Sequence, residues 1–153
     1  MYYPYFRGKQ FELILLRDNS KFIVKKNIHP IIEPVKHDFK SLIRAVSSMK
    51  KNKLNFTLVV NPKVSKNPVP ENKILKELIN DEFKNYNNLS LGYIMDAESK
   101  IVDLENIIKK YNNLSITIIH NGFTNGKDLS ISLEKYDNIK KHVFIDKQKE
   151  NYL

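Results

Sequence analysis

At 153 residues, with 41% hydrophobic and 28% charged side chains, the chain has the size and composition of one globular domain with a buried core. The absence of cysteine excludes disulfides, iron–sulfur clusters, thiolate zinc sites and a cysteine nucleophile. No apolar run reaches the ~18 residues of a membrane span and no signal peptide opens the chain, so we expect a cytoplasmic protein with no membrane partner.

The formal net charge of +9 is the strongest compositional bias. A basic chain can bind nucleic acid, but most basic residues here are lysine, whereas specific recognition of phosphates and bases depends on the planar guanidinium of arginine. Pairs of lysines also fall at the ends of predicted helices, where they favour the negative end of the helix dipole. The charge therefore indicates a solvated basic surface, with nucleic acid kept as a candidate partner.

Residues 1–27 are predicted to form an N-terminal arm and a helix. Residues 2–6 are mostly aromatic and restrained by Pro4, so we expect them to dock on the domain. Residues 11–16 are mostly apolar and indicate a short, substantially buried helix. Residues 21–27 are too short a run for their periodicity to distinguish helix from strand.

From residue 28 onward the chain repeats one pattern: a short apolar run, a polar residue where the run ends, and an amphipathic helix. Continuous apolar runs are typical of parallel strands that helices bury on both faces, and each repeat has the length of a βα unit. The sequence therefore predicts a single α/β domain over residues 1–153, with parallel βα repeats over 28–153. Strands are expected at 29–36, 56–60, 89–95, 114–119 and 142–145, and helices at 38–52, 74–86, 99–111 and 127–140.

Two architectures remain open for these repeats. One is an open, doubly wound sheet of five strands, and the other is half of a TIM-like (β/α) barrel. A closed barrel usually needs ~250 residues. A barrel-like chain of this length is therefore expected to pair with a second copy, or with a missing C-terminal half if it is a fragment of a longer barrel.

Three short motifs in the N-terminal third form a set: Tyr-x-Pro, Lys-x-x-Glu-Leu and Pro-[Leu/Ile]-Ile-Glu. The set resembles the N-terminal part of the bacterial and phage "beta protein" family. This resemblance implies a TIM-barrel-like fold within a longer protein, and it implies no particular reaction. The matching residues are Tyr3 or Tyr5 near Pro4, then Lys9, Glu12 and Leu13, and finally Pro30, Ile31, Ile32 and Glu33.

Polar residues follow the predicted strands at the point where each strand ends. Ligands of parallel α/β folds bind at the carboxyl ends of the strands, so we expect these residues to share one rim. Three of them are carboxylates, which are the ligands that Mg²⁺ and Mn²⁺ prefer, and Glu33, Asp96 and Asp146 are therefore the predicted metal ligands. The complete set of strand-end residues is Glu33, Asn61, Asp96, His120 and Asp146.

This residue set suggests metal-assisted hydrolysis of a phosphodiester, in a small substrate or in nucleic acid. A bound Mg²⁺ or Mn²⁺ ion would polarise a phosphoryl oxygen and activate water. Glu33, His120 and Lys9 are the predicted catalytic residues, with His120 as the acid or base. The predicted substrate-binding residues are Arg7, Lys36, Asn61 and Lys63.

A structural interpretation competes at each strand end. Asn61, Asp96 and Asp146 can begin a turn or cap a helix, whereas Glu33 is a poor turn former and is the strongest functional candidate. The remaining histidines, His29, His37 and His142, are assigned to the surface. The competing function is a non-catalytic module that binds a protein partner or nucleic acid.

No G-x-G-x-x-G, P-loop, H-E-x-x-H or G-x-S-x-G motif is present in the sequence. Their absence counts against dinucleotide-binding, nucleoside-triphosphate-binding, zinc-protease and serine-hydrolase functions.

Overall fold

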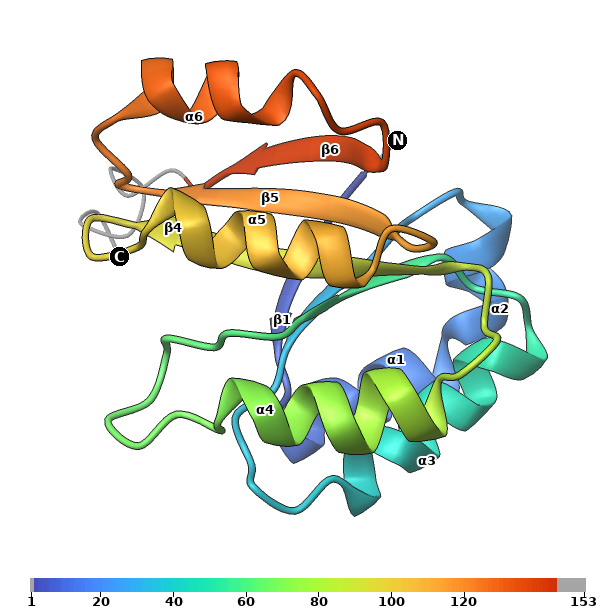
Figure 1. Cartoon of the computed structure of the whole chain (residues 1–153). Helices are drawn as coiled ribbons and strands as arrows, with labels where there is room; N and C mark the ends of the chain where they lie inside the picture. The colour runs from blue at the N-terminus through green and yellow to red at the C-terminus, as the bar shows by residue number, and fades with distance from the viewer. Residues whose placement is uncertain (1, 146–153) are drawn as a thin grey trace. The chain divides into compact units, whose positions relative to one another are not determined.

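The computed structural model describes residues 2–145 (Figure 1). The chain divides into two compact units, Met1–Ser90 and Leu91–Leu153, and each unit is described by itself. Both units alternate short strands with helices, and the strands pair in parallel, so the predicted α/β class is confirmed. Within residues 2–145, no helix combines the length and the apolar composition needed to cross a membrane.

The first unit is built around three short parallel strands. β1 pairs with β2, placing Arg7 beside Glu33, and β2 pairs with β3, placing Ile32 beside Leu58. Ile32 and Leu58 have no exposed surface, as expected for strands covered on both faces. The elements are β1 (Tyr5–Arg7), α1 (Gln10–Asp18), α2 (Ser20–Lys25), β2 (Ile31–Glu33), α3 (Lys40–Lys51), β3 (Phe56–Val59), α4 (Glu71–Ile74) and its π-helical continuation η1 (Leu75–Glu82).

The N-terminal arm contains a strand that the sequence pattern did not predict. The carbonyl of Tyr2 accepts a hydrogen bond from the backbone N–H of His29 at 2.9 Å, and the carbonyl of Pro4 accepts one from Ile31 at 2.8 Å. Proline lacks an N–H but keeps its carbonyl, so Pro4 is compatible with pairing at this edge. The described chain therefore has six strands, where five were expected.

Helix α3 has the predicted amphipathic face, whereas α1 is less buried than predicted. Leu42, Val46 and Met49 of α3 are buried at spacings of three and four residues. In α1 only Leu13 and Leu16 are buried, so the expectation of a substantially buried helix over 11–16 is wrong. The sequence leaves the structure of residues 21–27 open; in the structure, residues 21–25 lie in helix α2.

The second unit contains three further strands and two helices. Its elements are β4 (Leu89–Asp96), which begins in the last two residues of the first unit, α5 (Ile101–Lys110), β5 (Ser115–Asn121), α6 (Gly126–Leu133) and β6 (Ile139–Phe144). β5 and β6 pair in parallel, with an irregularity after Ile116 and with His120 beside Phe144. Leu129 and Leu133 of α6 are buried.

The last helix and strand differ from their predicted bounds because of Asn138. Its side-chain amide donates to the carbonyls of Tyr111 and Leu114, each at 3.3 Å, and to that of Ile108 at 3.5 Å. This anchor fixes the chain in an extended conformation directly before β6. β6 accordingly begins at Ile139 and not at residue 142, and α6 ends at Leu133 and not near residue 140.

Strand order follows the chain in each unit, β1-β2-β3 in the first and β4-β5-β6 in the second. A doubly wound sheet reverses its strand order at a switch point, whereas a βα barrel adds each strand beside the previous one. The order in each unit is that of the barrel-like alternative, and each set of three strands is open. Folds with this strand order bind their ligands at the carboxyl ends of neighbouring strands.

Candidate functional site

Glu33, the strongest candidate from the sequence, is enclosed in a hydrogen-bond network of the first unit. Its side chain is 4% exposed. The Tyr5 hydroxyl donates to Oε1, and the backbone N–H groups of Lys63 and Val64 donate to Oε2 at 2.7 and 3.0 Å. Burial, followed by the charge of Glu33 and the hydrogen bond to it, raises the pKa of Tyr5, which keeps this hydroxyl a donor.

The network joins three segments of the first unit at the carboxyl ends of their strands. The backbone carbonyl of Glu33 also accepts a hydrogen bond from the N–H of Gly8 at 2.7 Å. The carboxylate thus connects Tyr5, at the start of β1, and the loop after β3 to β2, while the backbone carbonyl of Glu33 connects β2 to Gly8, directly after β1. Because both oxygens are used within the protein, this geometry gives Glu33 a structural role, and its catalytic and metal-binding roles stay predictions.

The other predicted residues of the first unit lie around this network. Arg7 is exposed and lies beside Glu33 in the strand register, and Lys9 is exposed and directly precedes α1. Lys63 binds Glu33 through its backbone, and its side chain is exposed. Asn61 is buried after β3, while Lys36 is exposed after β2. The structure therefore brings Arg7, Glu33 and Lys63 close together.

Asp96 has the turn-forming role that the structural interpretation predicted for it. Its Oδ1 accepts hydrogen bonds from the Ser99 hydroxyl at 2.8 Å and from the backbone N–H of Glu98 at 3.1 Å. Such bonds stabilise the turn between β4 and α5. Asp146, the third predicted metal ligand, lies outside the described residues. Within residues 2–145, no three histidine, aspartate or glutamate side chains are grouped as a metal site would require.

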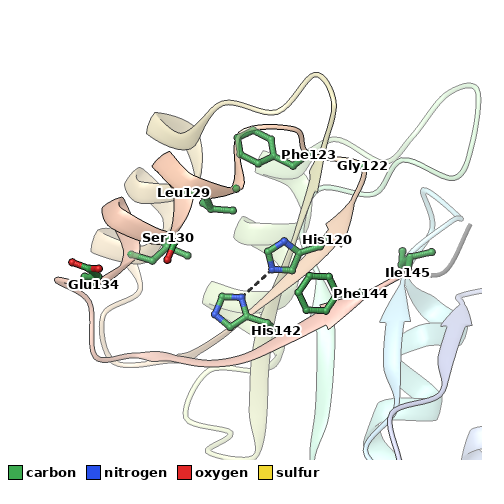
Figure 2. Close-up of a pocket in the computed structure, with 11 residues that line it drawn as sticks. His120, Gly122, Phe123, Leu129, Ser130, Glu134, His142, Phe144 and Ile145 are labelled. Carbon is green, nitrogen blue, oxygen red and sulfur yellow. Dashed lines mark hydrogen bonds between the residues drawn. The ribbon is translucent and has the colours of Figure 1, made fainter.

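His120 of the second unit has an arrangement of a different kind. Its Nε2 lies 2.9 Å from Nδ1 of His142, so the two rings share a hydrogen bond between β5 and β6 (Figure 2). The ring of His120 also stacks on Phe144, with centroids 4.4 Å apart and planes inclined by 11°. Parallel pairing of β5 with β6 places all three side chains on one face of these strands.

These rings line a hollow between α6 and the two strands. Figure 2 shows Leu129 and Ser130 of α6, with Glu134 directly after this helix, on one side and the two histidines on the other. The hollow has a volume of about 640 Å³, within the range of pockets for small organic ligands. Its polar side chains are His120, Ser130, Glu134 and His142, and its large apolar ones are Phe123, Leu129, Leu133, Phe144 and Ile145.

The environment of His120 favours the neutral ring. Partial burial, and then the nearby charge of His142, lower the pKa of His120 from its ordinary value of 6.5. When both rings are neutral, one nitrogen of the 2.9 Å contact carries the hydrogen and the other accepts it. Neither ring makes another side-chain hydrogen bond among residues 2–145. The outer nitrogens, Nδ1 of His120 and Nε2 of His142, remain available to a ligand.

The sequence pointed to His120 but missed two of its neighbours. His142 is exposed, as the sequence predicts, but its hydrogen bond to His120 is not predicted, and Phe144 is predicted only as part of a strand. A signal was present, because residues 142 and 144 lie two apart and therefore share one face of a strand. The missing information was the register between β5 and β6, which brings that face beside His120.

Fold and site together define a class: a parallel α/β protein with a ligand-sized hollow at the carboxyl ends of two neighbouring strands. Comparison of the chain with protein-family models, with curated proteins and with solved structures finds no match. The resemblance to the beta protein family therefore remains a prediction from the sequence.

Proposed function

We propose that the second unit binds a small organic ligand in the hollow beside α6, and that His120 and His142 exchange protons with it. The observation that carries the proposal is the 2.9 Å hydrogen bond between the two rings on the wall of this hollow. Imidazole changes its charge near neutral pH and is the side chain that most often serves as a general acid or base.

The hydrogen bond makes the two rings act as one unit. If His120 donates through Nε2, its Nδ1 is an acceptor and Nε2 of His142 carries a hydrogen. If His142 donates through Nδ1, the two outer nitrogens exchange these roles. In both tautomers the pair presents one donor and one acceptor, so a proton taken up at one end can be balanced by release from the other.

The lowered pKa of His120 supports a role as base, because a neutral ring can accept a proton at physiological pH. Stacking on Phe144 restrains the orientation of this ring. The apolar walls suit a planar hydrocarbon group, and Ser130 and Glu134 offer polar contacts on the side of α6. The ligand class that fits is a small planar molecule with an ionisable hydroxyl group.

Titration with p-nitrophenol, followed by calorimetry and by the absorbance of the phenolate, tests this proposal. The variants His120→Gln and His142→Gln should each weaken binding about tenfold, the effect of losing about 1.4 kcal/mol of interaction. The exposed His37 of the first unit supplies the matched control, and His37→Gln should bind as the wild type does. Equal binding by all four proteins, or none by the wild type, would refute the proposal.

Phosphodiester hydrolysis, proposed from the sequence, is the second candidate, with His120 as its acid or base. It is favoured by the pairing of His120 with His142, because in-line cleavage of a phosphodiester needs one group to accept a proton and another to donate one. Release of p-nitrophenol from bis(p-nitrophenyl) phosphate, measured with and without Mg²⁺ or Mn²⁺, tests it. Turnover that His120→Gln leaves unchanged would rule out the assignment of His120.

A further inference from the structure

Helices α1 and α3 of the first unit enclose a small hollow that the proposed function does not use. Its volume is about 60 Å³, enough to hold several water molecules. Residues of each helix three or four apart face it, as helical periodicity requires. The polar side chains at this hollow are Gln10 and Arg17 of α1 and Ser41 and Arg44 of α3.

The chemistry of this hollow is that of an anion site. Arginine is rare in this chain, yet Arg17 and Arg44 both line the hollow, and no carboxylate does. Arg17 uses its Nε to bind Oδ1 of the exposed Asp18 at 3.0 Å, which leaves its two Nη groups. Arg44 is exposed and makes no hydrogen bond or ion pair with the residues described. Two guanidinium forks match the oxygens of a phosphate group.

An exposed apolar stripe on α1 adjoins this anion site. The side chains of Phe11, Ile14 and Leu15 are 79%, 37% and 46% exposed, and their spacing of three and four residues places them on one face. Ile14 belongs both to the stripe and to the lining of the hollow. Single exposed apolar residues are ordinary, whereas a contiguous group next to basic side chains indicates an interaction surface.

Helix α2 extends the same combination of apolar and basic residues. Phe22 is 56% exposed, and Lys26 lies over its ring at 5.9 Å from the centroid. Lys21 and Lys25 of this helix are exposed as well. A second copy of the same surface would bring like charges together, so self-association is disfavoured. Apolar and aromatic side chains next to lysine and arginine are the combination by which helices bind anionic membrane surfaces.

We propose that the hollow between α1 and α3 binds a phosphate group, and that its ligand is the headgroup phosphate of an anionic phospholipid. Arg17 and Arg44 bind the phosphate oxygens, with Ser41 and Gln10 as neutral donors. Phe11, Ile14 and Leu15 enter the apolar layer beneath the headgroups. The first unit thereby associates with a membrane surface without spanning it, in contrast to the expectation from the sequence that the protein has no membrane partner.

Co-sedimentation of the full chain with vesicles tests this proposal. The wild type should bind vesicles of phosphatidylcholine mixed with phosphatidic acid, bind phosphatidylcholine alone weakly, and lose binding as salt rises. The double variant Arg17→Gln/Arg44→Gln should weaken binding about thirtyfold, as expected for two basic side chains at the surface. The double variant Phe11→Ser/Leu15→Ser, which changes no charge, should also weaken it.

Lys51→Gln/Lys76→Gln removes the same charge from exposed positions outside the hollow and the stripe, and is the matched control. It should bind within about threefold of the wild type; a loss equal to that of the arginine variant would mean that net charge alone drives binding and would overturn the proposal.

A second titration uses inorganic phosphate and follows the backbone amides of Ser41 and Arg44 by NMR. Phosphate-induced shifts without vesicle binding would overturn the lipid assignment. The absence of both phosphate-induced shifts and vesicle binding would overturn the anion site itself.

Discussion

Glu33 of the first unit and His120 of the second unit both lie at the carboxyl end of a strand, yet they use their polar atoms in opposite ways. Glu33 is buried, and both carboxylate oxygens accept hydrogen bonds from its own unit. His120 shares one hydrogen bond with His142, and both rings line a hollow of about 640 Å³. A strand-end residue is thus a functional candidate when its hydrogen-bonding capacity remains open to a cavity.

This contrast predicts where substitutions change stability and where they change binding. Variants of the closed network should lower the free energy of unfolding, and variants of the open pair should leave it nearly unchanged while weakening ligand binding.

Glu33→Ala should cause the largest loss of stability, about 3 kcal/mol, because it leaves three hydrogen-bond donors without their acceptor in a buried site. Glu33→Gln keeps the shape but replaces one acceptor oxygen by a donor, so an intermediate loss is expected. Urea denaturation followed by circular dichroism measures both. Glu98 is exposed, and Glu98→Ala should change stability by less than about 0.5 kcal/mol. A stable Glu33→Ala protein would return Glu33 to the functional candidates.

Asn138→Ala should lower the free energy of unfolding by about 2 kcal/mol, because the buried amide donates to three backbone carbonyls. The loss should appear as faster amide hydrogen exchange at the start of β6. Asn112 is an exposed asparagine of the same unit, and Asn112→Ala provides the comparison. If both variants were equally stable, Asn138 would not be the anchor that sets the start of β6.

Asp96→Ala should cost about 1 kcal/mol, the usual value of a side chain that stabilises a turn through backbone and hydroxyl donors. This strand-end carboxylate is half-buried, so water can replace its bonds at less cost than at Glu33. Denaturation of Asp96→Ala and of the exposed Asp137→Ala measures the difference. A loss as large as that of Glu33→Ala would contradict the distinction between buried and accessible strand ends.

The smallest effect concerns the pH dependence of stability. The folded protein holds the pKa of His120 below 6.5, so the unfolded chain binds this proton first as the pH falls. The wild type should therefore lose stability relative to His120→Gln between about pH 7 and pH 5. Thermal unfolding across this range measures the difference, with Glu134 and His142 as the other titratable groups at the hollow. Parallel curves for the two proteins would show that the ring is not held neutral.

The parallel βα repeats could be predicted because their signal is local. Ile31 and Ile32 form an apolar run without alternation, and the spacing of Leu42, Val46 and Met49 indicates one helical face. β1 was not predicted because it has only three residues, none of them fully buried, and directly follows a proline, so the run is too short to show strand periodicity. Its pairing depends on backbone groups at residues 28–33, which the local pattern does not report.

The candidate site could be predicted only in part, because its chemistry depends on contacts between distant segments. Glu33 was correctly placed at a strand end, but its role depends on the amides of Lys63 and Val64 in the loop after β3. His120 was correctly placed near the end of β5. Its partner His142 depends on a strand register with an irregularity, and one sequence does not specify that register.

The most direct test of the central claim is an NMR spectrum of the histidine ring nitrogens, recorded while p-nitrophenol is added. We expect the two rings to share one N–H and the signals of His120 and His142 to move together at a single dissociation constant, and in His120→Gln the signal of His142 should move only at about tenfold higher ligand concentration. Two rings that titrate independently, or signals that do not move with the ligand, would contradict it.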